Sequence, residues 1–226
     1  MKPKRDIIVA LDVDSPAKAK ALVRRLGRAV NFYKVAPSMQ MKDPRFIPWL
    51  RRAGKKVFLD CKWYDIPSQV QRSVQAAGRA GVTACTIHTS AGRRVMQAAL
   101  DARPRPLIWG VTVLTSLDRS DIREVGLDLE PPKQVLRLAK LAQETGLDGL
   151  VCSAQEVRLL RKSRVTIPLI TPGIQWGGAG GKDQRRLATP QQAWKDGSNF
   201  LVIGRAILEA KDPARTAKDI LEVIGG

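Results

Sequence analysis

Short apolar runs alternate with longer amphipathic segments along almost the whole of this 226-residue chain. The runs are rich in Val, Ile and Leu, which is typical of strands buried on both faces of a parallel sheet. Parallel strands must be joined by crossover connections, usually helices, and the amphipathic segments have the required length. The pattern therefore predicts repeated strand–helix units. The expected strands are residues 7–11, 32–35, 56–60, 84–88, 107–113, 149–152, 169–171 and 200–203.

Helix start and stop signals in the amphipathic segments support this interpretation. Ser15 followed by Pro16 is a typical helix start and Gly27 a typical stop, so the first helix is expected between them. Further helices are expected at residues 67–80, 92–102, 131–145, 154–162, 190–196 and 213–224.

The residues at the strand ends help to choose between a closed barrel and a doubly wound open sheet, since both give a repeated strand–helix pattern. Nearly every expected strand ends in, or is followed by, a reactive side chain or a glycine. These residues are Asp12, Lys34, Asp60 with Lys62, His88, Thr115, Ser153, Gly173, and Gly204 with Arg205. In a barrel they would converge on the carboxyl-terminal face, where this architecture places its active sites. We therefore predict an α/β fold, a (β/α)8 TIM barrel, formed by residues 1–226 as one domain.

The composition is that of an ordinary globular protein, with 44% hydrophobic and 27% charged residues. The apolar run after the basic N-terminus is cut short by Asp12, and no apolar stretch approaches the roughly 18 residues of a bilayer span. Cys61, Cys85 and Cys152 lie in apolar runs without redox or metal-binding spacing. We expect buried free thiols, no export signal, no membrane association and a cytoplasmic location.

The formal net charge of +18 is unusual and has two explanations. It indicates either a nucleic-acid partner or a basic surface that attracts an anionic metabolite. The lysines and arginines are spread along the helix-like segments, without interleaved aromatic residues and without a recognised nucleic-acid-binding module. This distribution argues against specific nucleic-acid binding.

The densest group of charges follows the third expected strand, in the stretch DCKWYDIP of residues 60–67. Residues two apart on an extended strand point to the same side, so Asp60 and Lys62 are expected to share a face. Asp65 follows shortly before a proline that can start the next helix. If Lys34 joins them from the neighbouring strand, four charges of mixed sign lie together, which is costly unless they compensate one another and usually marks a functional site. The alternative is an ordinary surface ion pair.

This stretch resembles the Asp-x-Lys-x-x-Asp-Ile-Pro signature of the bacterial orotidine 5′-phosphate decarboxylase family. Further motifs match in the same order: Ala10-Leu11-Asp12, Tyr33-Lys34-Val35, Ile87-His88-Thr89-Ser90, Val111-Thr112-Val113-Leu114-Thr115-Ser116, Thr171-Pro172-Gly173-Ile174, Asp183-Gln184-Arg185-Arg186 and Val202-Ile203-Gly204-Arg205. The resemblance implies an enzyme that converts orotidine 5′-phosphate to uridine 5′-phosphate (UMP), the last step of de novo pyrimidine nucleotide synthesis, without any cofactor.

The resemblance also implies catalytic roles for a charged tetrad of Lys34, Asp60, Lys62 and Asp65. Lys62 would stabilise the negative charge that develops at C6 of the pyrimidine and then protonate it. Asp60 would lie beside the substrate carboxylate and orient the two lysines. Asp65 would reach into the site of the partner subunit in a homodimer.

The remaining implied residues contact the substrate. They are Asp12 for the ribose, Thr115 for the pyrimidine, and Gln184, Gly204 and Arg205 for the phosphate. Two departures from the family pattern add candidates at the same site: Gln175 begins Gln175-Trp176 in place of the usual Arg-Pro, and Ser68-Gln69 replaces Asn-Thr. Because neither change touches the tetrad, we expect retained decarboxylation with weaker phosphate binding.

Two other functions remain open at this point. A metal-assisted sugar-phosphate decarboxylase or synthase of the same superfamily shares Asp-x-Lys-x-x-Asp, but typically has a carboxylate at the position of Lys34. A non-catalytic barrel that binds nucleotides or nucleic acid would show salt-dependent binding without turnover. His88, the only histidine, ends an apolar strand and is interpreted as structural. One histidine without clustered cysteines predicts no metal site.

Overall fold

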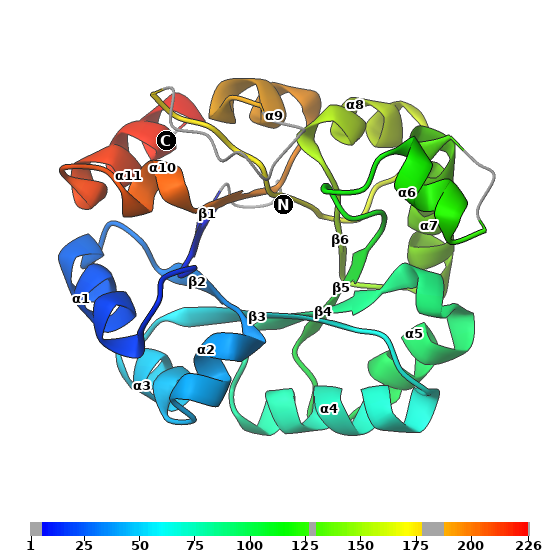
Figure 1. Ribbon diagram of the computed structural model, residues 1–226, viewed down its shortest axis with the longest axis horizontal. Helices are drawn as coiled ribbons and strands as arrows, with labels where there is room; N and C mark the ends of the chain where they lie inside the picture. The colour runs from blue at the N-terminus through cyan, green and yellow to red at the C-terminus, as the bar shows by residue number, and fades with distance from the viewer. Residues whose placement is uncertain (1–5, 127–129, 178–187, 226) are drawn as a thin grey trace.

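The computed structural model describes residues 6–126, 130–177 and 188–225. Its eight parallel strands close into a barrel, in which each strand pairs with the next along the chain and β1 pairs with β8. Figure 1 looks into this barrel and shows the helices forming a ring around it. The predicted (β/α)8 TIM barrel is confirmed.

The strands lie close to their predicted positions. They are β1 (Asp6–Ala10), β2 (Phe32–Val35), β3 (Lys56–Trp63), β4 (Ala84–His88), β5 (Leu107–Val111), β6 (Gly149–Val151), β7 (Leu169–Thr171) and β8 (Phe200–Ile203). Strand β3 continues past its predicted end because it pairs with β4 again after an irregularity. Strand β5 stops before residues 112 and 113 because its pairing with both neighbours ends at Val111. Strands β1 and β6 each end one residue before the prediction.

The helices expected from the sequence are all present. They are α1 (Pro16–Leu26), α4 (Pro67–Arg79), α5 (Arg93–Asp101), α7 (Pro131–Thr145), α8 (Ala154–Lys162), α9 (Pro190–Asp196) and α11 (Pro213–Val223). The signals at the ends of α1 act as predicted: the Ser15 hydroxyl accepts a hydrogen bond from the N–H of Lys18, and Gly27 ends the helix with a φ of 50°.

Several short helices were not predicted. They are α2 (Pro37–Lys42), α3 (Phe46–Arg52), α6 (Arg119–Glu124), α10 (Arg205–Leu208) and the 3-10 turn η1 (Thr89–Ala91). Each is too short for its apolar residues to establish a helical period. Helices α2 and α3 together form the connection between β2 and β3, whereas α1, α4 and α8 each form such a connection alone.

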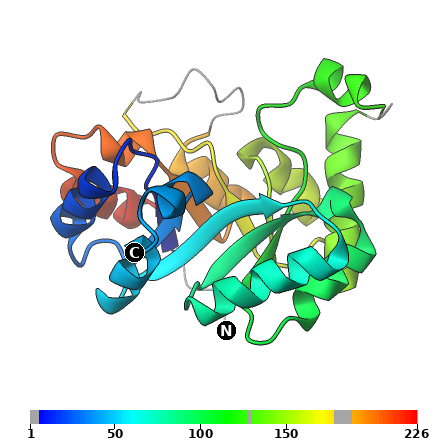
Figure 2. The same ribbon diagram turned by 60° about the horizontal axis from the view of Figure 1, so that its bottom comes forward.

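Two hydrophobic layers hold the barrel together. One lies between the strands and the surrounding helices; α4, for example, runs outside β3 and β4 (Figure 2) and buries Val70, Val74 and Ala77. The other fills the barrel itself, as is usual for this architecture. Its buried residues are Ile8, Ala10, Phe32, Phe58, Ala84, Trp109, Ile170 and Val202.

The inner core leads directly to the mouth of the barrel, by which we mean the carboxyl-terminal ends of the strands. Side chains alternate along a strand, so the residue two after an inward-facing core residue also faces inward. In β2, Phe32 of the core is followed in this way by Lys34. In β3, Phe58 is followed by Asp60. The barrel is therefore apolar in its interior and charged at its mouth.

Two expectations from composition can be compared with the structure. All three cysteines are free thiols; Cys85 and Cys152 are buried as predicted, whereas Cys61, near the end of β3, is only half-buried. Among the described residues, no helix is both long enough and apolar enough to cross a membrane.

Candidate active site

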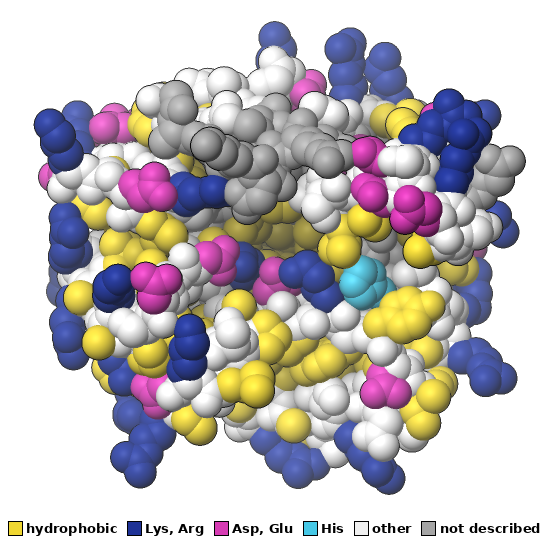
Figure 3. All heavy atoms as spheres, in the orientation of Figure 1, with side chains coloured by type: hydrophobic (Ala, Val, Ile, Leu, Met, Phe, Trp, Pro, Cys, Tyr) yellow, Lys and Arg dark blue, Asp and Glu magenta, His cyan; other side chains and the backbone are white. Residues whose placement is uncertain are grey.

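Charged side chains gather beside a hollow at the mouth of the barrel. Figure 3 shows the hollow near the centre of the view, with acidic and basic side chains and the single histidine along its edge. Ion pairs join Asp12, Lys34, Asp60 and Lys62, which we call the charged cluster. They belong to, or directly follow, the neighbouring strands β1, β2 and β3.

Asp60 is the centre of this cluster. Its Oδ2 lies 2.7 Å from the Nζ of Lys62 and 3.6 Å from the Nζ of Lys34. The Nζ of Lys34 also donates a hydrogen bond of 2.9 Å to Oδ1 of Asp12. One carboxylate oxygen thus faces two ammonium groups, and Lys34 bridges two carboxylates. The side chains of Lys34, Asp60 and Lys62 therefore lie together, as the sequence predicted.

The surroundings of Asp60 favour its ionised form. Burial acts to raise its pKa, but the positive charges of Lys34 and Lys62 and the hydrogen bonds from Lys62 and Thr86 act in the opposite direction. The net result is a pKa below the ordinary value of 3.8. A stable carboxylate therefore holds two ammonium groups in place at neutral pH.

Accessibility differs among the side chains of the cluster. Asp60 and Lys34 are only 12% and 13% exposed, whereas Lys62 is 36% exposed and Asp12 is 53% exposed. Asp60 and Lys34 therefore form the inner part of the cluster. The Lys62 and Asp12 side chains are the more available to a ligand in the hollow.

The backbone that carries Lys62 is irregular. Lys62 has a φ of 50°, and the pairing of β3 with β4 shifts register between Leu59 and Trp63. The alternation of an extended strand predicted that Asp60 and Lys62 share a face. Their ammonium and carboxylate groups do meet, but through a β-bulge and a left-handed residue, a device that re-aims side chains near active sites.

Asp65, the fourth member of the predicted tetrad, lies apart from the other three. It is exposed on the segment after β3, where its Oδ1 accepts a hydrogen bond of 2.7 Å from the N–H of Ile66. Within the described part of the chain, no ion pair joins Asp65 to Lys34 or Lys62. One chain alone thus assembles three of the four charges.

The predicted substrate-binding residues lie at several strand ends. Thr115 is half-buried in the turn after β5, and Ser68 and Gln69 are exposed in the first turn of α4. Gly204 joins β8 to α10, and Arg205 is the first residue of α10.

Two further positions predicted to bind substrate follow β7. The N–H of Gln175 donates a hydrogen bond of 2.9 Å to the carbonyl of Ala188. Gln184 lies outside the described residues.

His88 and Cys61 border the cluster without being ion-paired to it. The imidazole of His88 lies edge-to-face against Tyr64, with ring centroids 5.9 Å apart. Burial, and then the charge of Lys62, lower the pKa of His88 despite the opposing charge of Asp60, so the ring is neutral at pH 7. Burial and the Asp60 charge raise the pKa of Cys61 to about 12 although Lys62 opposes them, so Cys61 is a protonated thiol and a poor nucleophile.

Thr86 is a residue that the sequence did not single out. It is fully buried on β4, and its hydroxyl lies 2.9 Å from Oδ1 of Asp60. A threonine inside an apolar strand looks like an ordinary core residue. The available signal was its position two residues before His88, on the inward face of the neighbouring strand.

Comparisons with known proteins agree with the motifs of the chain. Residues 5–220 match the model of the Orotidine 5'-phosphate decarboxylase / HUMPS family. The protein named orotidine 5'-phosphate decarboxylase in Vibrio atlanticus is 46% identical over 221 residues, which make up 95% of this chain and 96% of the relative. The protein of the same name in Pseudomonas aeruginosa is 44% identical over 225 residues, 97% of each chain.

A solved structure gives the same result. The crystal structure of orotidine 5'-phosphate decarboxylase from Lactobacillus acidophilus matches with a TM-score of 0.88 at 32% identity, covering 99% of this chain and 100% of its own. The chain therefore belongs to the orotidine 5'-phosphate decarboxylase / HUMPS family.

Proposed function

We propose that this protein decarboxylates orotidine 5′-phosphate to UMP without a cofactor, as the last step of de novo pyrimidine nucleotide synthesis in the cytoplasm. The observation that carries the proposal is the ionised Asp60 held between the ammonium groups of Lys34 and Lys62 at the barrel mouth. The relatives named orotidine 5'-phosphate decarboxylase, similar over nearly the whole chain, support the reaction class.

The chemistry requires a positive group at the carbon that loses carbon dioxide. Departure of the carboxylate leaves an electron pair at C6, and an ammonium aimed at that carbon stabilises the charge as it forms. Lys62 then transfers a proton to C6, which completes the replacement of a carbon–carbon bond by a carbon–hydrogen bond. The partial exposure of the Lys62 side chain allows it to reach a ligand in the hollow.

Asp60 and Lys34 prepare this step. The Asp60 carboxylate lies beside the leaving carboxylate and fixes the direction of both lysines. Lys34, bridging Asp60 and Asp12, connects the reacting end of the site to the ribose, which Asp12 binds. These groups are already in contact in the free protein, so little reorganisation is needed at the moment of reaction.

The rest of the substrate is bound at the other strand ends. Thr115 contacts the pyrimidine, and the phosphate is held by Gln184, Gly204 and Arg205, with Gln175 in place of a charged partner. Ser68 and Gln69 lie at the start of α4 as further polar contacts. Phosphate binding far from C6 contributes to the rate because it orients the ring against Lys62.

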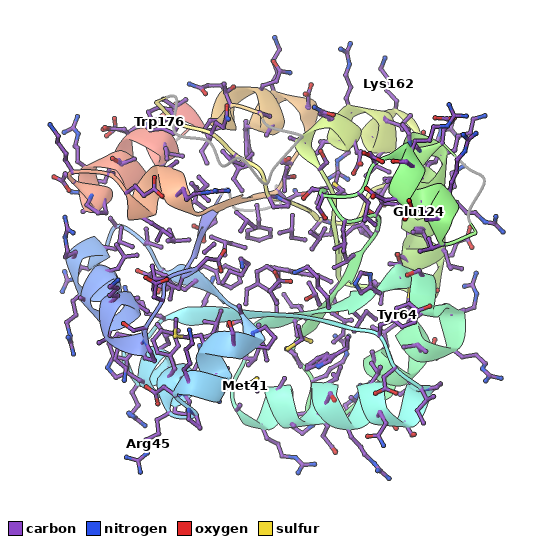
Figure 4. The ribbon with its side chains drawn as sticks, in the orientation of Figure 1. Met41, Arg45, Tyr64, Glu124, Lys162 and Trp176 are labelled. Carbon is purple, nitrogen blue, oxygen red and sulfur yellow. The ribbon has the colours of Figure 1, made fainter. Side chains whose placement is uncertain are left out.

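The protein acts as a homodimer in which Asp65 completes the partner's site. Tyr64 and Ile66, on either side of Asp65, are 65% and 60% exposed, and Met41 is 83% exposed. Tyr64 and Met41 both lie on the side of the barrel flanked by α2 and α4 (Figure 4). Large exposed apolar side chains beside a carboxylate are what a surface that inserts Asp65 into a second subunit requires.

A direct assay tests the proposed reaction. Purified protein is mixed with orotidine 5′-phosphate, with and without a metal chelator, and loss of the substrate's ultraviolet band is followed. The unmodified protein is expected to turn over in both conditions. Lys62→Ala is expected to lose about 10³-fold in kcat, the range of a lost general acid, whereas the control Lys140→Ala, exposed on α7, keeps full activity. Unchanged absorbance with the unmodified protein would refute the proposal.

The rival function is a metal-assisted reaction on a sugar phosphate, since the matching family model covers more than one activity. Lys34 argues against it, because a carboxylate is expected at this position in such enzymes. In the charged cluster Asp60 is already engaged by two ammonium groups, which disfavours its use as a metal ligand. Turnover of a sugar phosphate that stops on chelation would favour this rival.

A further inference from the structure

The ladder between β3 and β4 is broken where β3 enters the mouth. Leu59 pairs with Cys85 and Trp63 with Ile87, so three residues of β3 (60, 61 and 62) lie opposite a single residue of β4, Thr86. A bulge of this kind leaves main-chain groups without their usual ladder partners. At its end Lys62 adopts a φ of 50°, a conformation that non-glycine residues rarely adopt.

The Thr86 side chain provides a partner for one of these main-chain groups and for the Asp60 carboxylate. Its Oγ1 lies 2.9 Å from the main-chain nitrogen of Lys62 and 2.9 Å from Oδ1 of Asp60. A main-chain N–H can only donate, so the hydroxyl accepts from Lys62. Its own hydrogen is then free for the ionised Asp60 carboxylate, which can only accept. The directions of both hydrogen bonds are therefore fixed.

This arrangement gives the two carboxylate oxygens of Asp60 different partners. Oδ1 is held by Thr86, and Oδ2 is left for Lys62 at 2.7 Å and Lys34 at 3.6 Å. The same hydroxyl anchors the main chain of Lys62, the residue whose ammonium must reach C6. Thr86 is fully buried, so removal of its hydroxyl leaves the Lys62 N–H and Asp60 Oδ1 without this partner.

We propose that Thr86 is a positioning residue for the decarboxylation, one that fixes the Asp60 carboxylate and the Lys62 backbone through a single hydroxyl. The inference rests on the proposed function. Thr86 acts through these two residues and needs no contact with substrate. Threonine suits the position because its branched side chain is stiff at χ1, which keeps the hydroxyl in one place.

Removal of the hydroxyl at constant shape is the central test. Thr86→Val is expected to lower kcat about 10- to 100-fold, with KM changed by less than about threefold, because orientation is lost while the binding groups remain. The pKa of Asp60, followed by carbon NMR of its carboxylate, is expected to rise, since a hydrogen bond to the charged form is gone. Thr86→Ser keeps the hydroxyl and should stay within about threefold of the unmodified protein in kcat.

Thr171→Val is the matched control. Thr171, on β7, is equally buried, and its Oγ1 lies 2.6 Å from the hydroxyl of Ser198. The control removes a buried hydroxyl hydrogen bond elsewhere in the barrel, so Tm should fall as in Thr86→Val. The pKa of Asp60 should stay unchanged, because the lost bond does not involve the charged cluster.

The outcomes separate the two proposals. If the unmodified protein does not decarboxylate orotidine 5′-phosphate, the proposed function fails, and the Asp60 pKa still decides whether Thr86 positions the carboxylate. If the unmodified protein is active and Thr86→Val matches it in kcat and in the Asp60 pKa, only the Thr86 inference is overturned. If Thr86→Val does not fold, Thr86→Cys replaces it, since a thiol is a weak hydrogen-bonding group. Equality of Thr86→Cys and Thr86→Ser in kcat would then overturn the inference.

Discussion

The two oxygens of Asp60 have different partners, and this difference links its ionisation to stability as well as to the proposed catalysis. Oδ2 faces Lys34 and Lys62, and Oδ1 accepts from Thr86. Burial alone would disfavour the charge, and these contacts more than offset it. The ionised carboxylate therefore stabilises the folded state more than its protonated form does.

Acid unfolding should show this contribution. The folded-state pKa of Asp60 is lowered from 3.8, so the stabilisation is present above the unfolded pKa and is lost as the pH falls through the folded pKa. We expect the free energy of unfolding of the unmodified protein to fall more steeply below about pH 4 than that of Asp60→Asn, which cannot ionise. Urea unfolding curves from pH 6 to pH 2.5 measure the difference. Parallel curves for the two proteins would contradict the assignment.

The sequence located the charged residues but not the way in which the backbone presents them. Lys34 and Asp60 were predictable because they continue the inward-facing alternation of β2 and β3. The bulge and the positive φ of Lys62 were not, since they depend on the pairing of β3 with β4. Thr86 was missed for the same reason: its role depends on a neighbouring strand.

At the scale of elements, strands were easier to predict than short helices. The barrel strands are continuous apolar runs bounded by polar residues, and four of them, β2, β4, β7 and β8, have the predicted bounds. The connection between β2 and β3 is built from two short helices whose burial depends on the strands they cover. The hydrophobic period of a short segment does not reveal helices that are stabilised by packing against the rest of the protein.

Packing inside the barrel makes a prediction about the pair of strands β5 and β6. Gly149 pairs with Trp109, and a Cβ at Gly149 would lie 2.8 Å from Cδ1 of Trp109 and 2.9 Å from Cδ1 of Ile170. Gly149→Ala should therefore lower the free energy of unfolding by about 1–3 kcal/mol through overpacking. Denaturant unfolding measures the change.

The smaller ring of Trp109→Phe provides the control for this prediction. In the Trp109→Phe background, Gly149→Ala should lower the free energy of unfolding by less, because part of the clash is removed. A double-mutant cycle measures this coupling. If Gly149→Ala lowers the free energy of unfolding equally in both backgrounds, Trp109 is not the residue that the alanine contacts.

At the scale of the whole molecule, the net charge of +18 favours encounters with anions but does not identify them. The positive electrostatic potential of such a protein attracts a phosphorylated, carboxylated metabolite and a nucleic acid alike. The charged cluster favours the metabolite, because it combines carboxylates with ammonium groups at the mouth of a barrel. Such an arrangement favours a small ligand with charge at a defined atom over a phosphate backbone, which is bound mainly by positive charge.

Mixing two variants, each of which is expected to be inactive, tests whether Asp65 acts across a dimer. Lys62→Ala lacks the proposed proton donor, and Asp65→Asn lacks the carboxylate that one chain leaves exposed after β3. If Asp65 belongs to the partner's site, a mixed dimer contains one site with both native residues and one with neither. Random reassortment makes half of the dimers mixed, so activity should return to about a quarter of that of the unmodified protein. Turnover is measured after unfolding and refolding the two variants together, with each variant refolded alone as the control. If Asp65 instead serves its own subunit's site, no mixed dimer holds a complete site, and the mixture stays as inactive as its parts.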